Sequence, residues 1–125
     1  MSAESRLVDR WRALAACYND LAGRLDRALD DAHGVSLNEF ETLDRLLADE
    51  RDHCRMQDLA TVMYLSQSAL SRTVARLERD GLVERKMCPE DRRGVYVEIT
   101  DLGRARHADA RKTHLEILAA HLQED

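Results

Sequence analysis

The hydrophobic residues of the first thirty positions follow a helical repeat. Apolar side chains recur at alternating spacings of four and three residues, which keeps one face of a helix continuously apolar. They are Leu7, Trp11, Leu14, Tyr18, Leu21, Leu25 and Ala28. A helix of about 25 residues is roughly 38 Å long, more than a small domain is wide. The pattern therefore predicts either a long core helix within one chain or a helix that packs partly against a second chain.

Capping signals divide the next fifty residues into shorter helices. Gly34 is a typical residue at a helix C-terminus, and residues 36–39 have the spacing of a capping box, in which Ser36 accepts a hydrogen bond from the amide of Glu39 and Glu39 reaches back. A second helix therefore begins at Ser36. Further helices are predicted over about residues 56–63 and from Ser66 to Asp80-Gly81, after a polar break at residues 49–55.

After Gly81 the repeat changes from 3.6 residues to two, which is typical of strands with one buried face. The alternating apolar and polar positions include Val83, Arg85 and Met87 in one segment and Val95, Val97 and Ile99 in another. We predict two antiparallel strands joined by residues 89–94. Thr100 is a good N-cap residue, so a last helix is expected to begin there.

Together these elements predict a mainly α fold with a small antiparallel β-hairpin. Two helices joined by a tight turn, the second capped by a serine and followed directly by a hairpin, form a winged helix-turn-helix. The length of 125 residues fits a single domain. We expect a helix-turn-helix lobe over residues 36–100, flanked by long helices over residues 4–33 and 101–125.

The second helix of this motif leaves one face free of large apolar side chains. That face carries Gln67, Ser68, Ser71, Arg72 and Arg76. Short hydroxyls allow close approach to the floor of the DNA major groove, glutamine can pair with adenine, and arginine can bind both acceptors of guanine. At the hairpin tip, Arg92 and Arg93 can place a guanidinium in the minor groove. The motif therefore indicates binding to double-stranded DNA.

The same residues resemble those of a known family. Leu65-Ser66-Gln67-Ser68-Ala69-Leu70-Ser71-Arg72, the segment from 76 to 83, Pro89-Glu90-Asp91-Arg92-Arg93-Gly94-Val95 and Ile99-Thr100 closely resemble the MarR family of bacterial transcriptional regulators. The stretch from Cys88 to Gly94 is similar to the wing of a subgroup common in high-GC Gram-positive bacteria. The resemblance covers essentially the whole chain. One departure is Tyr64, at a turn position that is usually glycine or another small residue.

The resemblance implies a homodimeric regulator, most often a repressor, on a pseudo-palindromic operator. It implies that residues 4–33 and 101–125 form the dimer and that a small ligand, often aromatic or phenolic, or oxidation lowers DNA affinity. Arg72 would be the main base-reading residue, Arg93 would enter the minor groove, and Asp91 would brace Arg93 by an ion pair. Trp11, Tyr18 and Phe40 would border the ligand crevice, although core packing alone also explains aromatic residues at helical spacing.

Taken alone, the net charge of -5 argues against DNA as a partner, because DNA-binding domains normally carry a basic surface. Its distribution changes this conclusion. Residues 1–50 carry 6 basic and 11 acidic side chains, whereas residues 66–94 carry 7 basic and 5 acidic ones. The predicted recognition helix and wing are thus the basic part of the chain. We expect modest non-specific affinity and reliance on a few well-placed arginines.

The cysteines and histidines predict neither a disulfide framework nor a metal site. Cys17, Cys54 and Cys88 contain no C-x-x-C pair. Cys17 is expected to be buried, whereas Cys54 lies among Arg51, His53 and Arg55, whose charges would lower a thiol pKa and make it a candidate redox residue. His107, His114 and His121 recur every seven residues, too far apart along one helix to share a metal ion.

Several function classes are disfavoured. The longest apolar run has six residues, too short for a membrane span, and we expect a cytoplasmic protein without a cofactor. No nucleophile-elbow, phosphate-loop or zinc-protease motif is present, which argues against an enzyme. The alternatives to a ligand-responsive repressor are a regulator that responds to thiol oxidation and a winged-helix module that binds proteins instead of DNA.

Overall fold

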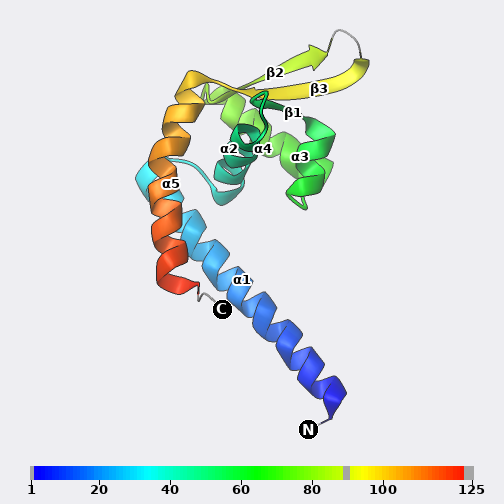
Figure 1. Cartoon of the computed structure of the whole chain (residues 1–125), viewed down its shortest axis with the longest axis vertical. Coiled ribbons are helices and arrows are strands. Elements are labelled where there is room, and N and C mark those ends of the chain that lie inside the picture. Colours follow the sequence, from blue (N-terminus) through cyan, green and yellow to red (C-terminus); the bar gives the residue numbers. More distant parts are fainter. Residues whose placement is uncertain (1, 89–90, 123–125) are drawn as a thin grey trace.

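Helices and strands account for most of the chain in the computed structural model (Figure 1), which describes residues 2–88 and 91–122, without the side chains of residues 88 and 91–93. The helices are α1 (Ala3–His33), α2 (Leu37–Ala48), α3 (Met56–Val62), α4 (Gln67–Arg79) and α5 (Asp101–His121). The strands are β1 (His53–Arg55), β2 (Val83–Cys88) and β3 (Asp91–Ile99). The predicted winged helix-turn-helix is confirmed.

Helix α1 is divided between the core and solvent. Its 31 residues span about 46 Å at 1.5 Å per residue, and its N-terminal half projects away from the rest of the molecule (Figure 1). Leu25 and Leu29, near its C-terminal end, are buried, and this end packs mainly against α5. In contrast, Leu14 and Tyr18 are 67% and 70% exposed. The core of this chain thus covers only the C-terminal part of α1. Of the two arrangements that the apolar repeat predicts, a helix that lies wholly in the core of one chain is not observed.

Side-chain caps begin the helices where the sequence predicts them. Ser36 accepts a hydrogen bond from Glu39 N at 3.1 Å, Ser66 accepts one from Ala69 N at 3.1 Å, and Thr100 accepts one from Gly103 N at 3.0 Å. Each cap satisfies an amide that has no partner within its helix. These bonds define the first residues of α2, α4 and α5.

One core joins α2, α3, α4 and the sheet. Its buried members come mainly from α2, α3, α4, β2 and β3, with Leu29 of α1 and Ala110 of α5, and Cys54 of β1 packs against them. The largest fully buried side chains are Phe40, Leu29, Leu43, Leu46, Leu59, Leu70, Leu77 and Leu82. Ala60 is also buried, where α3 and α4 cross, as expected for a small residue. The lobe is therefore a single packed unit that holds α4 against α2.

The sheet has three strands in the order β1-β3-β2, all antiparallel, so the prediction of a simple hairpin was incomplete. Strand β1 falls in the stretch expected to be a polar break and pairs Cys54 with Val97. Strand β3 begins at Asp91, so residues 91–94 belong to the strand and not to the connection. Backbone hydrogen bonds between strands thus define β1 and the start of β3, which the alternation of side chains does not indicate.

In the described part of the chain, no helix combines the length and the apolar character needed to cross a membrane.

Helix α5 can approach the sheet only because residue 103 has no side chain. A Cβ atom on Gly103 would overlap the carbonyl oxygen of Leu82 and lie 2.8 Å from Ile99 Cγ1. The same carbonyl accepts a hydrogen bond from Thr100 N at 3.1 Å. The start of α5 is therefore packed closely against Leu82, directly before β2.

We expect Gly103→Ala to lower the free energy of unfolding by about 1–3 kcal/mol, because the added methyl group must push α5 away from Leu82. Gly23→Ala is the matched control, since a Cβ there would meet only the flexible end of Arg27, at 3.2 Å. Replacing a glycine within a helix should stabilise by about 0.5–1 kcal/mol. Urea unfolding at one protein concentration measures both, and equal stabilities would contradict the packing of Gly103.

Candidate nucleic-acid interface

Helix α4 presents its polar face to solvent because its opposite face is in the core. Leu70, Val74 and Leu77 are fully buried. The polar residues predicted to read DNA are all exposed, and they are Gln67, Ser68, Ser71, Arg72 and Arg76. The structure therefore brings these five predicted residues together on one accessible surface, which we call the α4 polar face.

The two central arginines of this surface are unpaired among the described side chains. Arg72 and Arg76, one turn apart, line the same polar cavity of about 420 Å³ between α4 and the start of α2. Glu78, the acidic residue nearest to Arg76 in the sequence, is held by Arg85 of β2 through two hydrogen bonds of 3.0 and 3.1 Å to Oε1. Both guanidinium groups are thus available for a ligand.

Arg79 behaves differently from Arg72 and Arg76. Its Nε lies 3.5 Å from Asp80 Oδ1 at the C-terminal end of α4. The charge of Arg79 is therefore balanced within the protein, and we do not assign it to the α4 polar face.

The wing is present as a β-structure, but its key side chains fall outside the described residues. The backbone of Asp91, Arg92 and Arg93 belongs to β3, next to an irregular register between β2 and β3. The side chains of these residues, including the expected Asp91–Arg93 ion pair, are not described. Closer to the core, Lys86 Nζ lies 2.9 Å from Glu98 Oε2, and this bond raises the pKa of Lys86.

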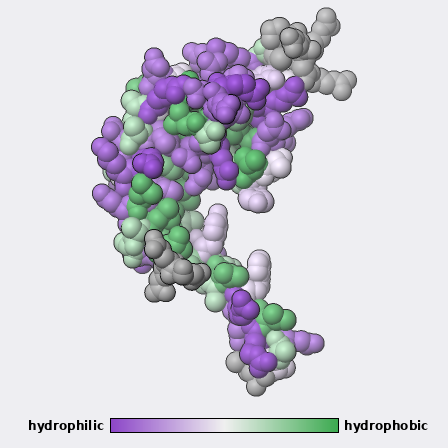
Figure 2. Space-filling model, in the orientation of Figure 1, coloured by the Kyte–Doolittle hydropathy of each residue, from purple (hydrophilic) through white to green (hydrophobic). Residues whose placement is uncertain are grey.

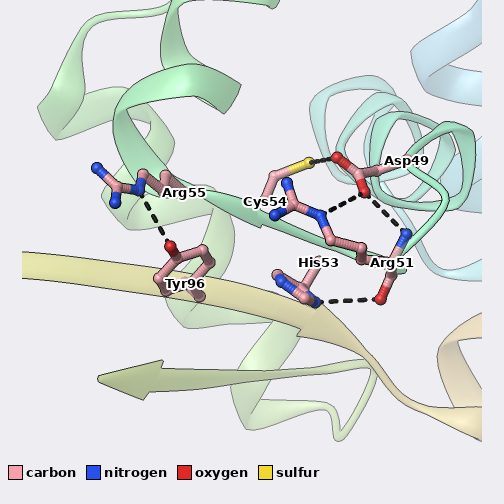
Figure 3. Close-up of polar contacts among 6 residues, drawn as sticks. All are labelled: Asp49, Arg51, His53, Cys54, Arg55 and Tyr96. Carbon is pink, nitrogen blue, oxygen red and sulfur yellow. Dashed lines mark hydrogen bonds and ion pairs between the residues drawn. The ribbon is translucent and has the colours of Figure 1, made fainter. Parts of the chain in front are cut away.

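A cluster on the outer face of the sheet was missed by sequence reasoning. Arg55 Nε donates a hydrogen bond of 3.1 Å to the Tyr96 hydroxyl, and the guanidinium carbon lies 5.5 Å from the centre of the Tyr96 ring (Figure 3). His53 contacts the same ring edge-on, with centroids 5.3 Å apart. The three residues meet because β1 pairs with β3, which no short-range pattern indicates.

Cys54 lies in a different environment from the one its sequence neighbours predict. Its Sγ donates to Asp49 Oδ2 at 3.8 Å, and Asp49 also accepts bonds from Arg51 N and Nε (Figure 3). Burial, and then the charge of Asp49, raises the pKa of Cys54 from its ordinary 9.0 to about 11. The expected lowering of this pKa is wrong, because burial and the neighbouring Asp49 outweigh the opposing charge of Arg51.

The other two cysteines stand as follows. Cys17 is exposed, so the expectation of a buried thiol is wrong, since the N-terminal half of α1 has no core to face within this chain. The side chain of Cys88 is outside the described residues.

A second cavity, of about 360 Å³, separates α1 from the helix-turn-helix lobe. Its lining residues include Tyr18 and Leu25 of α1, Arg45 of α2, and Tyr64 of the turn between α3 and α4. Of the three aromatic residues predicted to border a ligand crevice, only Tyr18 lines this cavity. Trp11 and Phe40 do not line it.

Phe40 is a core residue, and Trp11 lies further along the exposed part of α1. Phe40 is 1% exposed and stacks on His107 and His114 of α5, with ring centroids 5.1 and 4.6 Å apart. Trp11 is 69% exposed. Helical spacing alone cannot distinguish a residue in the core, or one exposed to solvent, from a residue that lines a cavity.

The histidines of α5 connect it to α2. His107 Nε2 lies 2.8 Å from Asp44 Oδ1, and His114 Nε2 lies 3.7 Å from Glu41 Oε1. The buried His107 and the half-buried His114 therefore form polar contacts between the two helices.

We expect Cys54 to react slowly with iodoacetamide at pH 8, because a pKa of about 11 gives a thiolate fraction about 100-fold below that of an ordinary cysteine. Asp49→Asn should accelerate the reaction several-fold, since it removes a carboxylate that raises the pKa. Asp58→Asn is the control, because Asp58 is the weakest of the contributing charges. Peptide mapping by mass spectrometry follows Cys54 alone, and rapid alkylation of the wild type would refute this environment.

Comparison with solved structures supports the assignment of the fold. Sco3205, a MarR family transcriptional regulator from Streptomyces coelicolor crystallised in complex with DNA, is 32% identical with a TM-score of 0.87, covering 98% of this chain and 76% of that one. AbsC, a MarR family transcriptional regulator from the same organism, is 30% identical with a TM-score of 0.85, covering 98% and 80%.

Sequence comparisons agree. The MarR family model matches residues 33–94, from the end of α1 into β3. The HTH-type transcriptional regulator YkoM of Bacillus subtilis (strain 168) is 26% identical over 98 residues, which are 78% of this chain and 62% of that protein. The match thus spans less than two thirds of this curated relative. The chain belongs to the MarR family of transcriptional regulators.

Proposed function

We propose that the chain is a homodimeric repressor that binds a pseudo-palindromic operator in the cytoplasm and is released by a small aromatic ligand. The observation that carries this proposal is the exposed α4 polar face, with Arg72 and Arg76 unpaired among the described side chains. The crystallisation of Sco3205 with DNA supports it. DNA binding, and not catalysis, accounts for the residues of this face.

The residues of the α4 polar face suit base recognition. Arg72 would bind the two acceptors of a guanine, Gln67 would pair with adenine, and Ser68 and Ser71 would allow close approach. Arg92 and Arg93 would contact the flanking minor groove from the wing. Because the whole chain is acidic, most of the affinity for DNA would come from these few arginines. The overall charge of the protein would contribute little attraction to the phosphates.

A second copy of the chain would cover the exposed apolar residues of α1. Leu7, Trp11, Leu14 and Tyr18 lie on one face of this helix and are each at least 64% exposed. Figure 2 shows hydrophobic side chains along the projecting part of the molecule and along the neighbouring end of α5. Contiguous apolar surface of this kind is typical of protein interfaces. To bind successive major grooves, such a dimer would have to hold its two α4 helices about 34 Å apart.

The cavity of about 360 Å³ between α1 and the lobe is the candidate ligand site. Its size falls within the range of small-molecule sites, about 300–1,000 Å³. It borders both the helix that would form the dimer and the turn that leads into α4. A ligand there would release DNA only to the extent that it binds the two conformations unequally.

We expect Arg72→Ala to weaken binding to the operator by about 1–3 kcal/mol and to relax base preference, because it removes a bidentate base contact. Arg76→Ala and Arg93→Ala should weaken binding as well. Arg79→Ala is the control, since Asp80 already balances that charge. Gel-shift titration of upstream DNA at several salt concentrations measures these effects. Absence of any salt-dependent DNA affinity would contradict the proposal and favour the alternative of a winged-helix module that binds proteins.

The dimer is tested by a charge placed on the apolar face of α1. Leu14→Asp should shift the protein to a monomer, because Leu14 is 67% exposed and would be covered only by a second chain. Ala16→Asp adds the same charge on the opposite, exposed face of α1 and should leave the dimer intact. Light scattering after size-exclusion chromatography gives the mass. A wild-type monomer, or a Leu14→Asp dimer, would refute this interface.

A further inference from the structure

Helix α2 carries a buried carboxylate that has no partner among the described residues. Glu39 is 6% exposed, and its backbone amide is bound by the Ser36 cap. The predicted capping box is therefore only half formed, because no hydrogen bond or ion pair joins the Glu39 carboxylate to Ser36 or to any other described residue. Buried charged groups are normally paired, since burial removes their hydration. The start of α2 alone thus does not explain this side chain.

The Glu39 carboxylate opens into the polar cavity of about 420 Å³ between α4 and the start of α2. Among the described residues, every wholly buried side-chain oxygen or nitrogen has a hydrogen-bond partner, so the unpartnered oxygens of Glu39 must reach the space of this cavity. Asp26 of α1 also lines the cavity, but its Oδ1 already accepts a hydrogen bond from Leu37 N at 2.7 Å. Glu39 is thus the lining carboxylate that is available to bind a donor.

The wall of the cavity that belongs to α4 supplies such donors. Ala69, Arg72, Thr73 and Arg76 line it, and their spacing of three and four residues places them on one side of the helix. The Thr73 hydroxyl donates to Ala69 O at 3.0 Å, so it is not available to Glu39. Arg72 and Arg76 remain, and no ion pair joins either of them to Glu39 in the structure without DNA. Arg72 occupies the middle of this row.

We propose that Glu39 is a positioning residue that directs the Arg72 guanidinium toward a base when DNA covers α4. A guanidinium has five N–H donors, and its bidentate contact with guanine uses two of them. A change of side-chain rotamer brings a remaining donor to the Glu39 carboxylate. Such a charge-assisted bond becomes stronger once DNA excludes water from the cavity. This inference rests on the proposed binding of DNA and adds the residue that directs its main base contact.

The same carboxylate acts against binding without base recognition. On a matching sequence, Arg72 binds guanine and Glu39 together. On other sequences, Arg72 can pair with a phosphate only by leaving Glu39, and the carboxylate is then a buried, unpaired charge close to the negative DNA backbone. Phosphate contacts carry no sequence information, whereas base contacts do. Glu39 therefore raises the ratio of specific to non-specific affinity and does not simply raise the affinity for DNA.

Two DNA probes measure this ratio in the full chain. One is a duplex that the wild type selects from a random-sequence pool, and the other is poly(dA-dT), which contains no guanine. Glu39→Gln keeps the size of the side chain and suits a capping box, but it removes the charge. We expect the ratio of the two dissociation constants, measured by fluorescence anisotropy, to fall about three- to tenfold, a part of the discrimination of one bidentate contact. An unchanged ratio would overturn the inference.

Two matched variants separate the position and the charge of Glu39 from other effects. Glu41→Gln removes the same charge from α2, but Glu41 faces His114 of α5 at 3.7 Å. It should leave the ratio within about twofold, because overall charge acts on both probes. Glu39→Asp keeps the charge with a shorter reach and should give a ratio between those of the wild type and Glu39→Gln. An equal fall in Glu41→Gln, or a Glu39→Asp ratio no higher than that of Glu39→Gln, would contradict the role of Glu39.

The background of Arg72→Ala tests whether Arg72 is the partner. There, Glu39→Gln should change the ratio by less than about twofold, because interacting residues are not additive. A full fall in that background would overturn the assignment to Arg72. If the wild type prefers the selected duplex and Arg72→Ala weakens this binding, but Glu39→Gln keeps the ratio, only this inference fails. If the wild type has no salt-dependent affinity for either probe, the proposed function fails, and the role of Glu39 with it.

Discussion

The buried face of α4 is the constraint on which the candidate interface depends. Leu70, Val74 and Leu77 are fully buried, and each such side chain contributes about 1.5–3 kcal/mol when it is removed from water. Rotating α4 by half a turn would expose these residues and bury Arg72, a charge that the interior strongly disfavours. The outward direction of Arg72 is therefore a consequence of core packing and requires no contact made by Arg72 itself.

Helix α2 connects this packed lobe to the two long helices. Asp26 Oδ1 of α1 accepts a hydrogen bond of 2.7 Å from Leu37 N, and His107 of α5 pairs with Asp44 of α2. Phe40 of α2 stacks on His107 in the core. In the proposed dimer, any change in the spacing of the two α4 helices has to pass through these contacts. The cavity lies against the same helix, so an occupant can favour one arrangement of lobe and long helices over the other.

Local patterns predicted the parts of the fold that depend on local physics. The helical repeat and the serine at position 66 identified α4 and its polar face, because capping and amphipathic burial act within a few residues. Strand β1 was missed since its three residues are held by pairing with β3, some forty positions later. The pKa of Cys54 was misjudged for a similar reason: Arg51 is adjacent in sequence, but burial and Asp49 determine the thiol. The sequence identifies Tyr64 as an unusual residue at a turn, but its exposure and its place beside the cavity are evident only in the structure.

We propose that the α4 polar face lies in the major groove of the operator. Protection of guanine N7 from methylation tests this most directly, because N7 is reached only from that groove. With the wild type, we expect two protected sets of guanines about one helical turn apart, and with Arg72→Ala we expect loss of protection at specific guanines. Guanine N7 atoms that stay unprotected, or protection that is identical in the wild type and Arg72→Ala, would contradict this placement.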